Sequence, residues 1–526
     1  MMGKADRQIT FSDYWLQGKI PENSYWHKIR KWAIENLNEE MFQPLFSYYG
    51  RASVSPVYTF TAMLIQLEKS YSDKEMEEET RFDDRVKYGI TAPRDFDGID
   101  SVTLCDHRKR FFTSDIGRKI LLKTINQAKD VGLFSDGNLH VIDSFMVWGA
   151  CTKQDTYTMI YQGIKMVLKL MTFYEMAEDG RKVLKRTDYN EKNNKPKINW
   201  EDSKEKAILL EGLVNDALAL VTYVREQKDV KDDLGESVNL LERIALQDVD
   251  IDKNGDITMK QGTAKDRIIS VNDPEMRHGR KTSSKLSDGY KAEIITGGEK
   301  ASIVIGIEVD GANTADGEHM SDLIDECKAD GNEIDKLYGD TAYCDWEEIE
   351  KRQTEGMEFC VKVPQVSNST GLYTKEDFHF DLDNGKVTCP AGYIGKFDPE
   401  KIKERKGTMV RFDAIICNQC KNKEQCTKAK EGRTIRINPY EDRIKEQREY
   451  QKTEIFKEDY CKRPNGERTI AQLTKHGGRK SRYVGKIKVK WQLSMSAINN
   501  NVKAIMGFVT TKIQDIAKGE VCLKVG

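Results

Sequence analysis

The first quarter of the chain has the apolar periodicity of α-helices. Residues 28–136 have apolar positions at helical spacing, and residues 53–56 are a helix start signal ahead of the apolar run through Met63 and Leu67. Ser72 and Glu75 have the spacing of a capping box and predict the start of a further helix. Pro93 then prevents a simple continuation of the run. The pattern predicts a helical N-terminal domain, either a recognition unit or a bundle that only packs.

The pattern changes to that of strands near residue 138. Residues 138–147, NLHVIDSFMV, form a short apolar run of strand length with Asp143 as its single acid. Residues 157–247 return to helical periodicity with many charges. Residues 290–296 and 301–309 are β-rich and are separated by Gly-Gly-Glu-Lys, which predicts a hairpin.

The segments after the hairpin alternate between helix and strand. Helical patterns are expected at residues 315–330 and 344–354, and strands at residues 333–338 and 358–363. Strand, hairpin, helix, strand, helix, strand is the order of a ribonuclease-H-like α/β core. We therefore predict an α/β fold with a mixed sheet and a helical insertion after the first strand.

This pattern divides the chain into six segments. They are a helical N-terminal domain expected to bind DNA ends (1–136), the first core strand region (137–156), a mainly helical insertion (157–270), the ribonuclease-H-like core (271–365), a cysteine-rich insertion subdomain (366–440), and a catalytic C-terminal helix with a basic DNA-binding region (441–526).

Composition narrows the class of protein only a little. A chain of 526 residues is expected to form several domains. The net charge of −2 does not indicate a polyanion-binding protein, although such a protein needs only local positive surface. Neither a signal peptide nor a stretch approaching a membrane span is expected. We expect a cytoplasmic, nucleoid-associated protein without a membrane partner, whose cysteines are not in disulfides.

Three acids stand out by their positions. Asp143 is expected on the first core strand and Asp340 directly after the strand at residues 333–338, whereas Glu467 lies between arginines ahead of an expected helix. A buried Asp is costly unless it is paired or bound to a cation. The alternatives are two hydrogen-bonded structural Asp residues and a solvated helical Glu. Together the carboxylates offer only oxygen ligands, as Mg²⁺ prefers, and could hold two such ions roughly 3.5–4 Å apart.

Several motifs resemble those of bacterial insertion-sequence DDE transposases, over nearly the whole chain. They are GRASVSP (50–56), YSDKE (71–75) and RFD (81–83) for the helical N-terminal domain, VIDS (141–144) for the first acidic motif, DPEMRHGR (273–280) with DGYK (288–291) for the segment entering the core hairpin, and GDTAY (339–343) for the second acidic motif.

The third motif in part of this superfamily is Tyr, two residues, Arg, three residues, Glu, six residues, Lys. Tyr460, Arg463 and Glu467 fit this spacing, but Thr474 stands at the lysine position and Lys475 follows it. The role of the lysine is therefore in doubt, whereas that of Glu467 is not. The resemblance implies that Tyr460 and Arg463 face the reacting strand, with Arg463 neutralising phosphate charge in the transition state.

The resemblance also implies an activity and partners. The implied enzyme cleaves transposon ends with Mg²⁺, for which Mn²⁺ can substitute, and transfers the strands into target DNA, acting as a homodimer on double-stranded DNA. Second-strand cleavage through a hairpin is weakly suggested. The alternatives are a metal-dependent nuclease without strand transfer and a transposase-derived DNA-binding regulator. The regulator would be marked by loss of an acid, and all three acids are present.

Four cysteines cluster between the second and third acidic motifs. Cys389, Cys417, Cys420 and Cys426 have the pattern C-x27-C-x2-C-x5-C, and tetrahedral zinc commonly takes four thiolates including one tight pair. Nearby lysines favour thiolates. We expect structural Zn²⁺ here, the alternatives being cysteines without metal or a redox pair.

A second possible ion site is better explained as a turn. Residues 250–256, DIDKNGD, match the start of a calcium-binding EF-hand loop, but Gln261 replaces the required glutamate. A polar hairpin with an Asn-Gly turn is the expected structure.

The segment around Glu467 is strongly basic. Between Cys461 and Lys503 there are eleven Lys or Arg residues, and Glu467 is the only acid. Such a segment suits DNA phosphates, although a solvated face, RNA or an acidic protein are alternatives. Tyr483 is expected to stack on DNA, and a helix is expected over residues 489–506. The residues expected to bind DNA are Tyr460, Arg463, Lys475, Arg479, Lys480, Arg482 and Lys486.

Overall fold

The computed structural model shows a mixed α/β protein with many helices. It describes residues 1–5, 14, 16, 18–134, 139–228, 230–282, 285–364, 366, 371–404 and 407–517. Asn138, in the first expected strand, and Cys522 lie outside these residues. All of the residues expected at a functional site are described.

The N-terminal part is helical, as the periodicity predicts. Its elements are α2 (Tyr25–Asn36), the 3-10 helix η1 (Glu39–Leu45), α3 (Pro56–Lys69), α4 (Asp73–Phe82), α5 (Asp84–Gly89), α6 (Ser101–Phe112) and α7 (Ile116–Asp130). The capping box of Ser72 and Glu75 forms and starts α4. Every residue of α3 from Pro56 to Leu67 is buried, so this helix is the centre of the bundle.

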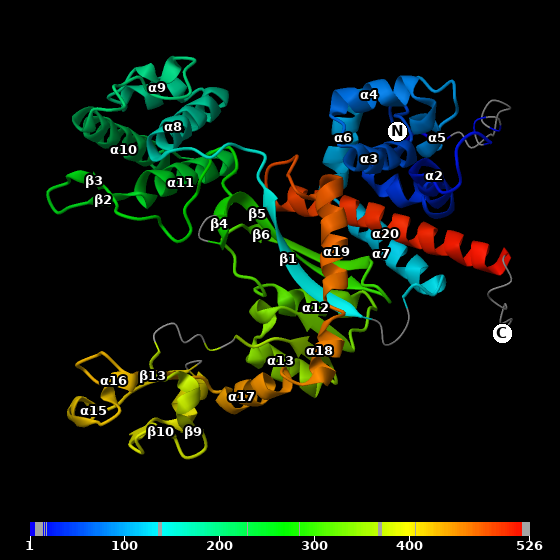
Figure 1. Cartoon of the computed structure of the whole chain (residues 1–526). Helices are drawn as coiled ribbons and strands as arrows, with labels where there is room; N and C mark the ends of the chain where they lie inside the picture. Colours follow the sequence, from blue (N-terminus) through cyan, green and yellow to red (C-terminus); the bar gives the residue numbers. More distant parts are fainter. Residues whose placement is uncertain are drawn as a thin grey trace.

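A mixed sheet lies at the centre of the molecule (Figure 1). Its strands are β1 (His140–Trp148), β4 (Arg277–Thr282), β5 (Lys285–Gly297), β6 (Ile303–Gly311), β7 (Lys336–Gly339) and β8 (Glu358–Val361). The strand order is β4-β5-β1-β7-β8, and β6 also pairs with β5. β5 is antiparallel to its three neighbours β1, β4 and β6, whereas β7 is parallel to both β1 and β8. The expected order of strands and helices is confirmed, and β4 is an addition that its polar sequence did not predict.

Helices connect and cover the sheet. α12 (Met320–Ala329) joins β6 to β7, and α13 (Trp346–Thr354) joins β7 to β8. The last elements are α17 (Glu441–Tyr450), α18 (Glu454–Tyr460), α19 (Pro464–Leu473), the turn η5 (Thr474–Gly478) and α20 (Lys486–Ala517). α20 packs against β6, α7, α3 and α2. Since the N-terminal helices and the sheet share one hydrophobic cluster, α20 joins them into one unit.

The segment between β1 and β4 forms a helical unit with its own hydrophobic core. It contains α8 (Thr156–Phe173), α9 (Ala177–Lys182), the 3-10 helix η2 (Asp188–Asn190), α10 (Ser203–Arg225), α11 (Asp232–Gln247), β2 (Val249–Ile251) and β3 (Ile257–Met259). β2 and β3 pair antiparallel, which confirms the hairpin in place of a calcium loop.

The helix α10 corrects one expectation from the sequence. Among the described residues it is the one helix long and apolar enough to cross a membrane by length and composition, so the statement that no stretch approaches a span was wrong. Its apolar side chains, such as Leu213 and Leu220, are buried in the core of the helical unit. The apolar composition of α10 is therefore accounted for by packing inside the helical unit.

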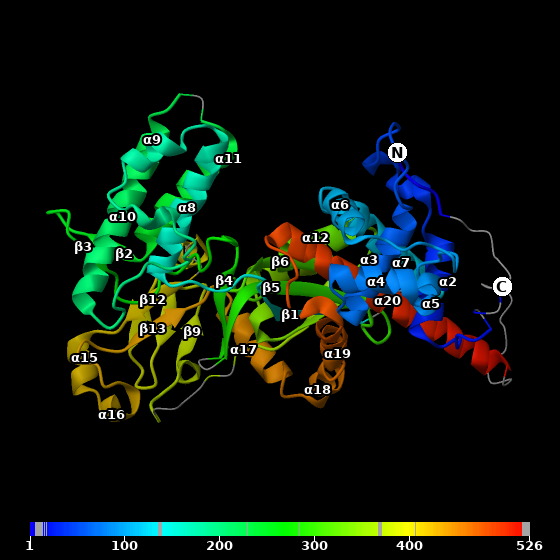
Figure 2. The same ribbon diagram turned by 90° about the horizontal axis from the view of Figure 1, so that it is seen from above.

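The cysteine-rich segment folds into a third, smaller unit around Val387, Phe412 and Ile437. It contains the 3-10 turn η4 (Lys375–Asp377), β9 (His379–Asp381), β10 (Lys386–Thr388), β11 (Ile394–Lys396), α14 (Pro399–Glu404), β12 (Thr408–Arg411), α15 (Ala414–Gln419), α16 (Lys423–Cys426) and β13 (Thr434–Ile437). Figure 2 shows this unit and the helical unit on one side of the sheet, with the N-terminal helices on the other.

Candidate active site

Two of the three acids lie on neighbouring parallel strands. Asp143 lies within β1, and Asp340 directly follows β7. Val141 is paired with Tyr338. Because both strands run in the same direction, continuing this register by two residues places Asp143 beside Asp340. The strand pattern of the sequence therefore locates both acids correctly.

The third acid is brought to β1 by α19. Glu467 lies in the first turn of this helix, which begins at Pro464. Glu467 thus lies on a helix, but within its first turn and not ahead of it. Pro464, a residue favoured at the first helical position, was the available signal for this earlier start. The helix lies very close to β1, since a Cβ built on Gly466 would be 2.6 Å from Val141 Cγ1. The Thr469 hydroxyl also donates to the Ala301 carbonyl at 2.8 Å.

Arg463 links two of the acids. Its Nη2 is 3.0 Å from Asp143 Oδ2 and its Nη1 is 2.5 Å from Glu467 Oε1. The side chains of Arg463 and Asp143 are only 13% and 15% exposed, whereas that of Glu467 is 53% exposed. Burial raises the pKa of Asp143 to about 6, Arg463 opposes this rise, and Asp340 and Glu467 add to it. Asp340 and Glu467 are thus near enough to Asp143 to repel its negative charge, and Arg463 offsets that repulsion.

The donor chemistry of this cluster suits a divalent cation. Three carboxylates offer the oxygen ligands that Mg²⁺ prefers. Among the described residues, however, no group of three or more His, Cys, Asp or Glu side chains is arranged to hold a metal ion. In this conformation a guanidinium holds Asp143 and Glu467 together.

A polar network supports the site from the neighbouring strand and loops. The Ser144 hydroxyl donates to Asp316 Oδ1 at 2.7 Å, and Lys291 Nζ is 2.8 Å from the same oxygen. Glu293, opposite Ser144 in the sheet, accepts a hydrogen bond from the Tyr343 hydroxyl at 3.3 Å. Burial raises the pKa of Glu293. The sequence pattern did not single out these residues, although Glu293 is the single acid of the β-rich run at residues 290–296, a signal similar to the one that singled out Asp143.

Tyr460 lies on the Asp340 side of the cluster. Its hydroxyl donates to the Gly339 carbonyl at 3.3 Å, and its ring stacks on Phe456 at a centroid distance of 5.3 Å. Lys362 Nζ lies 4.3 Å from the centre of the same ring. Burial raises the pKa of Tyr460. These contacts hold the ring against the end of β7, next to Asp340.

The basic segment runs along the end of β1. The Arg479 carbonyl accepts a hydrogen bond from the Trp148 backbone at 2.9 Å, and Lys480 forms an isolated bridge with Trp148. Lys475, Arg479 and Lys480 are exposed, and Arg482 is half-buried. These side chains stay predicted DNA contacts.

Tyr483 was wrongly expected to stack on DNA. Its ring packs edge-on against Phe112 at 5.1 Å and against Trp491 at 6.1 Å, while Arg108 lies over it at 5.4 Å. The ring thus belongs to the packing between the N-terminal helices and α20. Its partners are distant in sequence, so the local basic pattern could not show this.

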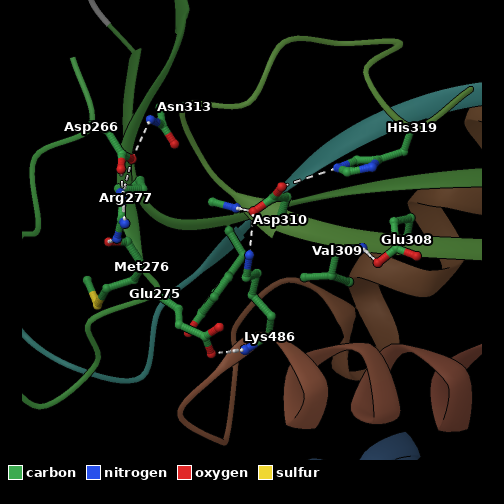
Figure 3. Close-up of polar contacts among 12 residues, drawn as sticks. Asp266, Glu275, Met276, Arg277, Glu308, Val309, Asp310, Asn313, His319 and Lys486 are labelled. Carbon is green, nitrogen blue, oxygen red and sulfur yellow. Dashed lines mark hydrogen bonds and ion pairs between the residues drawn. The ribbon is translucent and has the colours of Figure 1, made fainter. Parts of the chain in front are cut away.

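Lys486 is largely engaged within the protein (Figure 3). Its Nζ is 3.0 Å from Asp310 Oδ1, and its backbone N–H donates to Glu275 Oε2 at 2.8 Å. Asp310 also contacts His319 Nε2 at 3.3 Å. These contacts fix the start of α20 to β6, and a contact of Lys486 with DNA stays a prediction.

The four clustered cysteines meet around one cavity. Cys389, Cys417, Cys420 and Cys426 all line a cavity of about 210 Å³ in the third unit. Burial raises the pKa of Cys426, Arg433 lowers it, and the three other thiols raise it further. The sequence pattern thus identifies residues that lie together, although their arrangement in the described structure is not that of a metal site.

The comparisons with known proteins concern the C-terminal part of the chain. Residues 388–506 match the family model described as Transposase DDE domain, a range that contains the cysteine cluster, Glu467 and most of α20. No curated protein and no solved structure matches the chain. Glu467 lies within the matched range, whereas Asp143 and Asp340 lie outside it. The match supports the resemblance of the chain to insertion-sequence DDE transposases.

Proposed function

We propose that this protein cleaves the ends of a transposable DNA element and joins them to target DNA. The observation that carries this proposal is the meeting of Asp143, Asp340 and Glu467 from two parallel strands and one helix. The strand order supports it, because three antiparallel strands followed by two parallel to the first is the ribonuclease-H-like arrangement. We assign the core to that fold.

The three carboxylates would hold the divalent ions, Mg²⁺ or Mn²⁺. Such ions activate the attacking water or 3′-hydroxyl and stabilise the leaving oxygen. Arg463 has a separate task in the proposal. Its Nε is buried and has no hydrogen-bond partner in the described part of the chain, so this donor loses no protein partner if the side chain moves toward a phosphate oxygen. A guanidinium released from Asp143 would then neutralise charge that develops on the phosphate.

The basic segment supports DNA as the partner. Exposed Lys475, Arg479 and Lys480 follow the helix that carries Glu467. Cleavage of two paired ends requires two active sites, so we propose a homodimer on double-stranded DNA. Second-strand cleavage through a hairpin is the route suggested by Tyr460 and Arg463.

The test is cleavage and joining of plasmid DNA that carries the inverted repeats flanking the coding region. Asp143→Ala, Asp340→Ala and Glu467→Ala should each abolish cleavage in Mg²⁺ and leave DNA binding largely intact. Glu350→Ala is a matched control, because Glu350 is exposed on α13. Full cleavage by Asp143→Ala would refute the assignment. Cut DNA without joined product would instead favour a nuclease.

We also propose that the four cysteines bind one structural zinc ion. What supports this is that all four thiols line one cavity and that the other three contribute to raising the pKa of Cys426. Elemental analysis should find one zinc per chain, and Cys417→Ser should lose it. Cys105→Ser, a change outside the cluster, is the control. A metal-free wild-type protein prepared without chelator would contradict the proposal.

A further inference from the structure

Lys362 occupies a position next to Asp340 that the sequence analysis did not single out. Gly339 is paired with Val361 across the parallel strands β7 and β8. The next residue of each strand, Asp340 and Lys362, therefore leaves the same edge of the sheet. With Asp143 level with Asp340 on the other side, the three residues lie in a row across three strands.

Lys362 differs from nearby lysines in its partners. Lys452, Lys457 and Lys462 each form an ion pair with an acid three residues earlier. Lys362 is exposed and forms no ion pair within the described residues, its ammonium being held over the ring of Tyr460. A cation–π contact orients an ammonium without cancelling its charge as a carboxylate does.

This ammonium opens onto a groove of about 870 Å³, which we call the Lys362 groove. Half of its lining residues are basic or aromatic, and the lining includes Thr341, Lys362, Arg448, Lys457 and Tyr460. Glu376 is the acid that lines it, and this side chain lies 3.4 Å from Arg448. The groove thus offers positive charge directly beside an acidic cluster.

We propose that the Lys362 groove binds the backbone of the DNA strand next to the reacting phosphate, with Lys362 contacting one phosphate. This inference rests on the proposed function. Cations that contact phosphates favour the approach of a polyanion to three carboxylates. Lys475 lies eight residues beyond Glu467, roughly 12 Å along the helical axis, in the turn that follows α19. Lys362 supplies a cation on the Asp340 side.

The experiment measures DNA binding as a function of salt in an Asp143→Ala background, which prevents cleavage. The probe is a fluorescent DNA duplex of arbitrary sequence, and binding is followed by anisotropy across a KCl series. Lys362→Gln should reduce the slope of log K against log[salt] by about 0.9, the value of one phosphate contact. Lys362→Arg should keep the parent slope. Lys351→Gln on α13, a lysine paired with Glu348, is the control.

Each outcome bears on the inference. An unchanged slope for Lys362→Gln would overturn it, and a reduced slope only for Lys475→Gln would assign the phosphate to that lysine instead. A slope that Lys362→Arg fails to keep, together with a lower melting temperature, would show that Lys362 merely supports Tyr460. Absence of duplex binding by the parent protein would contradict the proposed function itself, a result distinct from an unchanged slope.

Discussion

Gly466 sets how closely α19 approaches β1, and replacing it by alanine should impair catalysis more than stability. The new Cβ would lie 2.6 Å from Val141 Cγ1 and 2.8 Å from Val141 Cβ, where ordinary contacts are 3.4–4 Å. The Val141 Cβ is fixed to the backbone of a central strand and cannot move aside. The helix must therefore retreat by about 1 Å, and Glu467, the next residue, moves with it.

The expected loss of stability in Gly466→Ala is small, whereas the expected loss of cleavage rate is large. Overpacking costs roughly 1–3 kcal/mol, and alanine gains about 1 kcal/mol over glycine in a helix, so the net loss of stability is roughly 0–2 kcal/mol. A displacement of about 1 Å in a catalytic constellation can reduce the rate by roughly 100-fold. Gly466→Ala should therefore fold but cleave plasmid DNA about 100 times more slowly.

Cleavage rate and urea unfolding, measured on the same preparation, test this prediction. Gly507→Ala on α20 is the matched control, since a Cβ there meets nothing within 4 Å. That variant should be more stable by about 0.5–1 kcal/mol and cleave at the wild-type rate. Wild-type cleavage by Gly466→Ala would refute the argument that this approach positions Glu467.

Three other changes test the packing and charge of the fold. Arg463→Ala removes the cation between two carboxylates and should lower the free energy of unfolding by roughly 3 kcal/mol, measured in urea with a chelator present. Mg²⁺ should partly restore this stability. An equal loss with Mg²⁺ would contradict the idea that a divalent ion can replace the guanidinium between these carboxylates. Burial, and Arg110 to a smaller extent, lowers the pKa of His107 from 6.5 to about 4. The unfolded chain therefore binds a proton that the folded chain excludes, and stability should fall by about 2 kcal/mol from about pH 7 to about pH 5, a loss absent in His107→Gln. Asn501→Ala removes the side-chain oxygen that accepts a hydrogen bond from the buried Val304 N–H at 2.8 Å. The free energy of unfolding should fall by about 1–3 kcal/mol, measured by thermal unfolding. An unchanged melting temperature would contradict a stabilising role of this hydrogen bond.

Local patterns in the sequence predicted much of the core. Alternating apolar runs located the strands, and acids within or after such runs identified Asp143 and Asp340. The hairpin of β5 and β6 followed from its turn, and the polar hairpin of β2 and β3 from a missing ligand at Gln261. These features succeed because each depends on a few neighbouring residues.

Features that depend on distant residues were not predictable in the same way. The contact between Arg463 and Asp143 joins residues 320 positions apart. The burial of Tyr483 depends on Phe112, and β4 is a strand only because its polar sequence pairs with β5. A single sequence contains no local signal for such pairings.

The long separation between Asp143 and Arg463 has a consequence for the newly made chain. β1 leaves the ribosome well before α19, because Arg463, the cation that offsets the charge of Asp143, follows that acid by 320 residues. Until α19 reaches the sheet, the nascent protein holds two acids of the site without the third. Assembly of the three-acid site therefore waits for the synthesis of α19, and a product interrupted before this helix carries an incomplete site.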